Sequence, residues 1–234
     1  MEKFGLIGYP LKGSGSPALF ASAYGGKWNY DLIENPDFET AWGIFLEGYR
    51  AINITAPFKE AAFRKMAETG TVDAGCRELG AINIAVKTPE GIKGWNSDYL
   101  GVLKILKEKG FGKGKTALCI GFGGAGRAAA AAAGAAGMDT VICNRSIKAP
   151  GMRPLQDIPI LAAVSDLIIY SIPFPVPEME GVHVPALLEA NYRTPSYRGA
   201  ADLYIPGEEW LKAQADTGYP LMVQGLEHKA AHNF

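Results

Sequence analysis

Short apolar runs alternate with longer mixed segments along the first hundred residues. The runs predict strands over residues 4–7, 28–33, 51–54 and 81–86, and the mixed segments predict helices from Ser16, over 38–46, and from Pro57 to 66. Ser16 is the expected N-cap of the first helix, with Pro17 in its first turn. Alternating strands and helices are typical of an α/β sheet, whose ligands bind where the strands end.

The second half of the chain shows a sharper alternation. Residues 98–109 predict a connecting helix, 116–120 a buried strand, and 140–143 a second strand after an alanine-rich helix. Further strands are expected over 166–172 and 200–204, and a helix over 208–217. The connecting helix near residue 100 is the expected boundary between two α/β domains.

A glycine-rich loop directly follows the strand at 116–120. Gly121, Gly123 and Gly126 have the G-x-G-x-x-G spacing of dinucleotide-binding loops. In such loops the first glycine allows a tight turn, the second lets a pyrophosphate approach the backbone, and the third lets helix and strand pack closely. The free N–H groups at the start of the next helix bind phosphate. This context favours a nucleotide site over the alternative, a purely structural turn.

The residues at the end of the next strand indicate whether the site prefers NAD or NADP. NAD-binding units place an Asp or Glu there, about 20 residues further on, to bind the ribose 2′-hydroxyl. This chain has Asn144, Arg145 and Ser146 instead. Because a guanidinium pairs with a 2′-phosphate and stacks on adenine, Arg145 favours NADP over NAD. The alternative is an ordinary exposed arginine at a strand end.

Several polar residues of the first half stand at positions that suit a site. Lys59 lies at a helix start, where the helix dipole disfavours a cation, and this cost favours a functional role over a solvated lysine. Asp98 stands at the start of the connecting helix, where capping is its alternative role. Ser14 and Ser16 lie one residue apart among glycines, and they form either a flexible turn or a pair of hydroxyls directed at an anion.

Together these motifs resemble those of the shikimate dehydrogenase family, in the family's order and over most of the chain. The matching segments are GYPLKGSGSP at 8–17, NITAPFK at 53–59, GAIN at 80–83, GWNSD at 94–98, GFGGAGR at 121–127, NRS at 144–146 and DLYIP at 202–206. The expected fold is α/β, with a substrate-binding and catalytic domain over 1–100, joined by the tail 226–234, and a Rossmann-type doubly wound NADP-binding domain over 101–225.

The resemblance implies a reaction and a set of site residues. The reaction is the reversible, NADP-dependent reduction of 3-dehydroshikimate to shikimate in aromatic amino-acid biosynthesis. Lys59 and Asp98 are implied as the catalytic pair, with Lys59 as the acid/base group. The implied substrate-binding residues are Ser14 and Ser16 for the carboxylate, Thr55, Asn83 and Asp98 for ring hydroxyls, and Tyr204 and Lys229. The implied cofactor-binding residues are Gly121, Gly123, Gly124, Ala125, Gly126, Asn144, Arg145, Ser146 and Ile172.

Three segments depart from the family pattern. Gly13 replaces the histidine of the family's His-Ser-x-Ser. In the loop beside the nicotinamide, Ile172 replaces a hydroxyl residue and Pro175 replaces a glycine. The family's late G-L-x-M-L-x-x-Q-A-A, whose Gln contacts substrate, is aligned with residues 225–234, and a gap of a few residues in this alignment puts Lys229 at the place of the Gln.

The amino-acid composition limits which partners and which kinds of site are expected. The 234 residues include 23 Lys and Arg against 24 Asp and Glu, so no basic field favours nucleic acid or anionic lipid. Cys119 and Cys143 lie in apolar runs, and with Cys76 they make neither a disulfide framework nor a zinc site; we expect no metal. We expect no signal peptide, and we expect a cytoplasmic monomer or homodimer. A quinate/shikimate dehydrogenase of broader specificity and a non-catalytic shikimate-binding paralogue stay open as alternatives.

Overall fold

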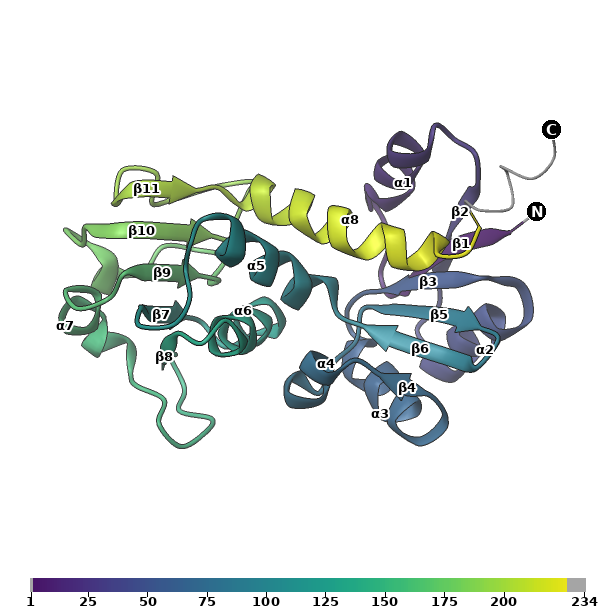
Figure 1. Cartoon of the computed structure of the whole chain (residues 1–234), viewed down its shortest axis with the longest axis horizontal. Coiled ribbons are helices and arrows are strands. Elements are labelled where there is room, and N and C mark those ends of the chain that lie inside the picture. The colour runs from purple at the N-terminus through teal and green to yellow at the C-terminus, as the bar shows by residue number, and fades with distance from the viewer. Residues whose placement is uncertain (1, 227–234) are drawn as a thin grey trace. The chain divides into compact units, whose positions relative to one another are not determined.

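The computed structural model describes residues 2–226, which form two compact units (Figure 1). The first unit comprises residues 2–97 and 216–226, and the second comprises 98–215. The sequence division grouped 216–225 with the second domain. In the structure, Met222 and Val223 pack against Phe4 and Phe20, which places this segment in the first unit. The roles of the two domains stay predictions.

The first unit contains a mixed six-stranded sheet in the order β2-β1-β3-β5-β6-β4. Its strands are β1 (Lys3–Gly8), β2 (Asn29–Glu34), β3 (Ala51–Ile54), β4 (Thr71–Val72), β5 (Ile84–Thr88) and β6 (Gly91–Trp95). β1 is parallel to both β2 and β3, whereas β5 is antiparallel to both β3 and β6. Four helices belong wholly to this unit: α1 (Ser16–Tyr24), α2 (Phe38–Gly48), α3 (Lys59–Thr69) and α4 (Ala74–Leu79).

Two apolar layers cover the faces of this sheet. On one face, α2 and α3 pack against β1 and β3 through residues such as Trp42, Phe45 and Met66. On the other face, Phe20 of α1 joins Phe4 and a ring of aromatic side chains. Because both faces are covered, β1 and β3 are buried almost throughout.

Two helix starts differ from the sequence prediction. The N-cap of α1 is Gly15, without a side-chain cap bond, so the prediction that Ser16 caps this helix was wrong and Ser16 is its first residue. Pro57 lies in a turn closed by the bond from Phe58 N–H to Thr55 O (2.9 Å), so α3 begins at Lys59 rather than at Pro57.

The second unit contains a five-stranded, wholly parallel sheet in the order β11-β10-β9-β7-β8. Its strands are β7 (Thr116–Ile120), β8 (Asp139–Cys143), β9 (Leu167–Tyr170), β10 (Val184–Glu189) and β11 (Ala201–Ile205). Its helices are α5 (Ser97–Glu108), α6 (Gly124–Ala135), α7 (Ile158–Ala162) and the first part of α8 (Gly207–Val223), with 3₁₀ turns at Leu155–Asp157 and Pro177–Met179.

The strand order of the second sheet reverses at β7. The chain passes from β7 to β8 on one side and then returns to β9 on the other side. Open parallel sheets bind ligands at such a switch point, outside the carboxyl ends of the strands. The Rossmann-type prediction is confirmed, and it locates the glycine loop after β7 at the switch point.

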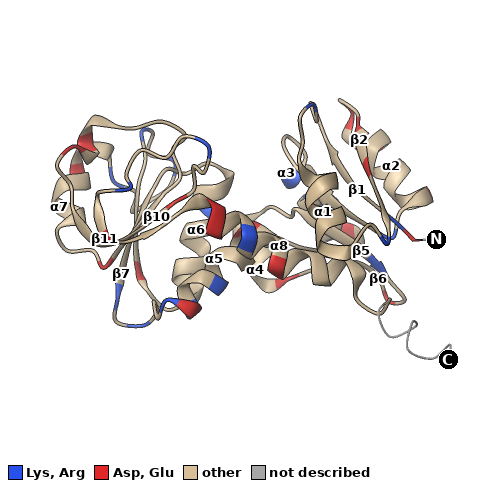
Figure 2. Cartoon of the chain, turned by 90° about the horizontal axis from the view of Figure 1, so that it is seen from above, with Lys and Arg blue, Asp and Glu red and all other residues tan. Residues whose placement is uncertain are grey.

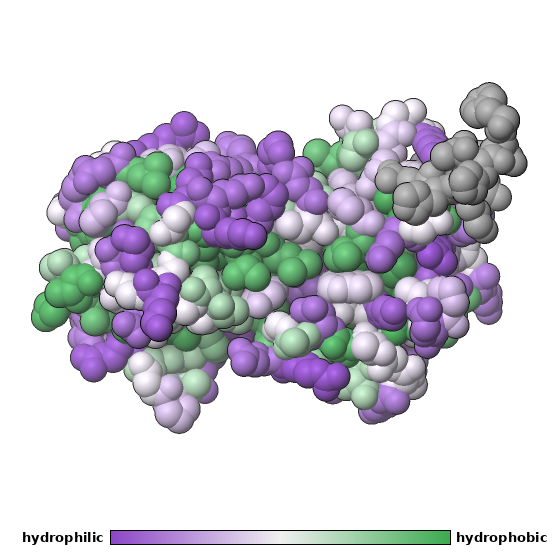
Figure 3. Space-filling view, viewed as in Figure 1, coloured by the Kyte–Doolittle hydropathy of each residue, from purple (hydrophilic) through white to green (hydrophobic). Residues whose placement is uncertain are grey.

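Charged and apolar residues are mixed over both units. Figure 2 shows Lys and Arg interspersed with Asp and Glu, in keeping with the balanced charge. The face in Figure 3 likewise mixes hydrophilic and hydrophobic residues. No helix within residues 2–226 is long and apolar enough to cross a membrane.

Candidate functional site

The predicted substrate residues of the first unit converge on one edge of its sheet. Ser14 follows β1, and Thr55 and Lys59 follow β3, the parallel neighbour of β1, so these strands end at the same edge. Asn83 directly precedes β5, which is antiparallel to β3, and its carbonyl accepts from Ile54 N–H at 2.8 Å. Segments far apart in sequence are thus brought together by strand pairing.

The two serines are linked by a hydrogen bond. Ser14 Oγ donates to Ser16 Oγ at 3.2 Å, and Ser16 N–H lies 3.4 Å from Ser14 Oγ. Both side chains are half-buried in the segment between β1 and α1. Because Gly15 and not Ser16 caps α1, neither hydroxyl is used for capping.

Asn83 is held in one orientation by its neighbours. It is 6% exposed, and its Oδ1 accepts from Ser97 N–H at 2.7 Å and from Ser97 Oγ at 3.2 Å. These two bonds use the carbonyl side of the amide, so Nδ2 is the group that remains to donate to a ligand hydroxyl. Asn83 therefore has the chemistry that its predicted role requires.

Lys59 and Asp98 each lie in the first turn of a helix. Lys59 is the half-buried first residue of α3. Asp98 is 8% exposed and lies inside the first turn of α5, which begins at Ser97, so Asp98 is not the N-cap. Its backbone carbonyl accepts from Trp210 Nε1 at 3.2 Å. A carboxylate in the first turn is favoured by the helix dipole, whereas the Lys59 ammonium is not.

The three glycines of the loop after β7 have the geometry that the motif predicts. Gly121 has φ +98°, and a Cβ there would lie 2.6 Å from Ser171 Oγ. A Cβ at Gly126 would lie 2.3 Å from Gly121 O, so only glycine allows α6 to pack this closely on the loop. Gly123 faces open space and caps α6 without a side chain. Gly124 and Ala125 follow it in the first turn of α6, whose N–H groups suit a phosphate.

The segment after β8 fits a cofactor with a 2′-phosphate. Asn144 is fixed by bonds from its Nδ2 to Ser146 O at 2.8 Å and from its N–H to Arg153 O at 3.0 Å. Arg145 is exposed between them. Since β8 pairs with β7, this segment follows the strand next to the glycine loop. An exposed guanidinium and the lack of a carboxylate at 144–146 suit NADP better than NAD.

The loop after β9, which contains Ile172, is held by two tyrosines. Tyr170 OH donates to Phe174 O at 2.7 Å, and Val176 N–H donates to Tyr197 OH at 2.8 Å. The two rings meet edge to face, with centroids 4.6 Å apart. These contacts fix the loop although Ile172 and Pro175 depart from the family pattern.

Glu189 anchors the segment that carries Tyr197. This carboxylate is 1% exposed and accepts from Ser196 N–H at 2.7 Å, Tyr197 N–H at 3.2 Å and Tyr204 OH at 2.8 Å. Burial, followed by the bond to Glu189, raises the pKa of Tyr204 well above its usual value. The hydroxyl of Tyr204 is therefore engaged within the second unit, and its role in substrate binding stays a prediction.

Helix α8 contains a match that the sequence alignment missed. Residues 207–216, GEEWLKAQAD, fit G-L-x-M-L-x-x-Q-A-A without a gap at Gly207, Leu211, Gln214 and Ala215. Gly207 is required here, because a Cβ would lie 2.7 Å from Ala190 O. Lys229, aligned earlier with the Gln, lies outside the described residues. The unbroken spacing from Gly207 to Gln214 was the signal that identifies Gln214.

The family's D-x-x-Y-x-P motif, which the sequence comparison aligned with DLYIP at 202–206, also has a second match. The acid and the tyrosine of D-x-x-Y are three residues apart, as Glu189 and Tyr192 are, whereas Asp202 and Tyr204 are two apart. The Asp202 side chain is 77% exposed and pairs with His183 at 2.9 Å, whereas Glu189 is buried. Tyr192 is therefore a further candidate at the carboxyl end of β10.

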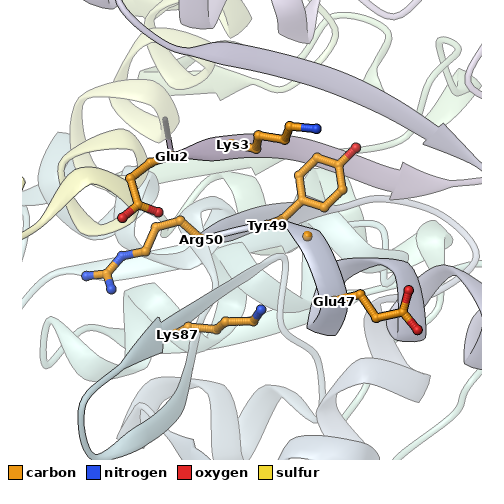
Figure 4. Close-up of a pocket in the computed structure, with 7 residues that line it drawn as sticks. Glu2, Lys3, Glu47, Tyr49, Arg50 and Lys87 are labelled. Carbon is orange, nitrogen blue, oxygen red and sulfur yellow. The ribbon is translucent and has the colours of Figure 1, made fainter.

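A hollow of about 290 Å³ lies at the opposite edge of the first sheet (Figure 4). It is lined by Glu2, Lys3, Glu47, Gly48, Tyr49, Arg50 and Lys87. Figure 4 shows the charged ends of Lys3, Arg50 and Lys87 pointing in different directions, so they do not converge on one ligand. This hollow does not have the geometry of an anion clamp.

The cysteines of the described chain are buried thiols. Burial raises the pKa of Cys76 and Cys119 to about 12 and that of Cys143 to about 11. Within residues 2–226, no group of three or more His, Cys, Asp or Glu side chains is arranged to hold a metal ion. His228 and His232 are spaced i, i+4 in the sequence, which favours a solvated helix face over a metal site, and they lie outside the described residues.

Known proteins resemble this chain over most of its length. The shikimate dehydrogenase substrate-binding domain family matches residues 6–85. The shikimate dehydrogenase (NADP(+)) of Halothermothrix orenii is 37% identical over 153 residues, covering 62% of this chain but only about half (52%) of its own length. That of Acidiphilium cryptum is 32% identical over 246 aligned positions, covering 98% of this chain and 88% of its own length.

A solved structure shares the fold. The shikimate 5-dehydrogenase of Thermus thermophilus, in complex with NADP(H) and shikimate, superposes with a TM-score of 0.72 at 25% identity, covering 95% of this chain and 93% of that one. The match to the Acidiphilium protein extends over both units, including the glycine loop and α8. From these sequence and structural matches, the chain belongs to the shikimate dehydrogenase family.

Proposed function

We propose that the protein is an NADP-dependent shikimate dehydrogenase, which reversibly reduces 3-dehydroshikimate to shikimate. One observation carries the proposal: Ser14, Ser16, Thr55, Lys59 and Asn83 are brought by strand pairing to one edge of the first sheet. The second unit adds a dinucleotide loop at the switch point of its sheet.

Lys59 is the proposed acid/base group. NADPH supplies a hydride, and reduction of a ketone leaves negative charge on its oxygen. An ammonium that donates a proton to that oxygen lowers the barrier. In the oxidation direction, neutral Lys59 accepts the hydroxyl proton. Asp98, the second member of the proposed pair, accepts a hydrogen bond from a substrate hydroxyl and orients the substrate.

The other polar residues bind the substrate in this proposal. Ser14 and Ser16 donate to its carboxylate, in bonds strengthened by the ligand's charge. Thr55 and the Nδ2 group of Asn83 bond to ring hydroxyls. Gln214 takes the place that the late motif gives to a substrate-contacting Gln.

In this proposal, different groups of residues bind different parts of NADP. Gly121, Gly123, Gly124, Ala125 and Gly126 accommodate the pyrophosphate against the backbone. Arg145, with Asn144 and Ser146, binds the 2′-phosphate. Ile172 lies in the loop assigned to the nicotinamide.

The experiment that tests this function is oxidation of NADPH by 3-dehydroshikimate, followed by the absorbance of the reduced nicotinamide. The proposal expects activity in the wild-type protein and its loss in Lys59→Ala. NADPH binding without oxidation would contradict it.

Two related functions are separated by the same assay. A quinate/shikimate dehydrogenase would also oxidise quinate. A non-catalytic paralogue would bind ligand without turnover, and the departures at Ile172 and Pro175 are the observation that favours it. We also infer a cytoplasmic monomer or homodimer that acts on small molecules and takes neither nucleic acid nor membrane as a partner.

A further inference from the structure

Tyr30 is a polar side chain inside the aromatic layer under α1. It lies on β2, and its ring packs against Phe20 of α1, with centroids 4.9 Å apart. The register pairs it with Phe4 of β1. No sequence motif singled out this tyrosine, because an aromatic residue in a strand is expected simply for packing.

The hydroxyl of Tyr30 reaches the proposed substrate residues. It donates to Asn53 Oδ1 at 2.8 Å, and the side chain of Ser16 also hydrogen-bonds to it. Since Ser14 donates to Ser16, the hydroxyls form a series from Ser14 through Ser16 and Tyr30 to Asn53. Burial raises the pKa of Tyr30 far above its usual value, so this phenol keeps its proton throughout any practical assay range.

Each hydroxyl in this series has a single hydrogen. Tyr30 gives its hydrogen to Asn53, so its bond with Ser16 uses the hydrogen of Ser16. When Ser16 donates to a carboxylate instead, Tyr30 can turn its hydrogen from Asn53 to Ser16. A hydroxyl that accepts a hydrogen bond is a stronger donor. Rotation of the Tyr30 hydroxyl toward Ser16 therefore strengthens the bond from Ser16 to the carboxylate.

The loop that carries the serines is held by its backbone: Ser14 N–H donates to Leu11 O at 3.0 Å, and Leu11 N–H donates to Glu34 Oε2 at 2.9 Å. Gly13 stands where the family pattern has a histidine, and a Cβ at either Gly13 or Gly15 would meet nothing within 4 Å. Ser16 is not held by capping either, since Gly15 is the N-cap. The hydroxyl of Tyr30 is therefore a contact by which β2 holds the side chain of Ser16.

We propose that Tyr30 is a positioning residue, which acts through Ser16 to set the affinity for the substrate's carboxylate. The inference rests on the proposed function, because that function makes Ser14 and Ser16 the carboxylate clamp. Tyr30 does not take part in hydride or proton transfer.

The test is Tyr30→Phe, which keeps the ring and removes the hydroxyl. The KM for shikimate is expected to rise about 3- to 10-fold, with kcat within twofold of wild type and the KM for NADP unchanged. The same kcat/KM comparison is then made with shikimate methyl ester, in which the carboxylate is masked. The loss caused by Tyr30→Phe should disappear with the ester.

Tyr49→Phe is the matched control. Tyr49 OH donates to Asp31 Oδ2 at 2.9 Å in the same unit, away from the serines, so this variant loses one tyrosine hydrogen bond without touching the clamp. Its KM for shikimate should equal that of wild type. Thermal unfolding of both variants shows whether they fold.

Ser16→Ala provides a second, independent comparison. If Tyr30 acts through Ser16, adding Tyr30→Phe to Ser16→Ala should change shikimate affinity less than twofold. An unchanged KM in Tyr30→Phe, an equal loss with the ester, or full additivity with Ser16→Ala overturns the inference while leaving the proposed function intact. A wild-type protein that neither binds nor oxidises shikimate overturns the proposed function, and the inference with it.

Discussion

The two units present their candidate sites in different ways. In the first unit, side chains from separate segments meet at a sheet edge and are joined by hydrogen bonds, as Ser97 is joined to Asn83. In the second unit, the central feature is backbone, a loop in which Gly121 and Gly126 leave no room for a Cβ. Removing one side chain from the first site should therefore weaken it by the loss of that group's bonds. In the second site, a single added methyl group, as in a Gly→Ala substitution, should disrupt the whole loop.

The largest expected effect is on the chemistry of the first site. Lys59→Ala should lower kcat by about 10²–10⁴-fold, because the general acid is lost, while the protein stays folded. Lys65→Ala on the same helix, which removes an exposed pair with Glu39, should leave kcat unchanged. Steady-state kinetics measure both variants. A Lys59→Ala enzyme within threefold of wild type in kcat would remove Lys59 from the mechanism.

The next effect contrasts two glycines of α6. In Gly126→Ala the added methyl group would lie 2.3 Å from Gly121 O, which is backbone and cannot turn away. Unfolding in urea should show a loss of about 1–3 kcal/mol, together with loss of NADP binding. Gly134→Ala meets nothing within 4 Å and should stabilise the helix by up to about 1 kcal/mol. Equal behaviour of the two variants would refute the close-packing role of Gly126.

A smaller effect is expected at the 2′-phosphate. Arg145→Ala should weaken NADP binding about tenfold or more and leave NAD binding unchanged, because only NADP has the phosphate. Arg198→Ala, which removes another exposed arginine of the same unit, is the control. Isothermal titration calorimetry measures these affinities. A parallel loss of NAD affinity in Arg145→Ala would argue that Arg145 acts on the fold and not on the phosphate.

The smallest effect concerns the loop assigned to the nicotinamide. Tyr197→Phe removes the acceptor for Val176 N–H. NADP affinity should fall a few-fold, whereas the affinity for 2′,5′-ADP, which lacks the nicotinamide, should not change. If both ligands lose affinity equally, Tyr197 supports the whole unit and not this loop.

The strands were predicted best where an apolar run is short and clearly bounded. β3 and β7 have the predicted bounds, Ala51–Ile54 and Thr116–Ile120. β10 was missed, because Pro185 interrupts its apolar run and proline argues against an interior strand. The end of α8 was placed too early, since Gly218 and Pro220 weaken a helix. In the structure, Gly218 instead allows close packing against Ile84, where a Cβ would lie at 2.8 Å.

The candidate site was predicted residue by residue, but its hydrogen bonds were not. Local rules made Ser16 an N-cap, because they weigh only its neighbours in sequence. In the structure Ser16 is instead the first helical residue, and its side chain bonds to the hydroxyl of Tyr30 from a different strand, a contact that depends on how β2 and α1 pack. Gln214 was overlooked for a different reason: the motif begins with Gly-Leu, and the late Gly-Leu pair is at 225–226, whereas Gly207 is followed by a glutamate.

The central claim is tested most directly by reduction of NADP⁺ with shikimate at alkaline pH, where release of a proton favours oxidation. The account predicts NADPH formation that depends on shikimate, is faster than with quinate or with NAD⁺, and is lost in Lys59→Ala. Measurable NADP binding with no NADPH formed from either shikimate or quinate would contradict the account and favour a ligand-binding paralogue without catalysis.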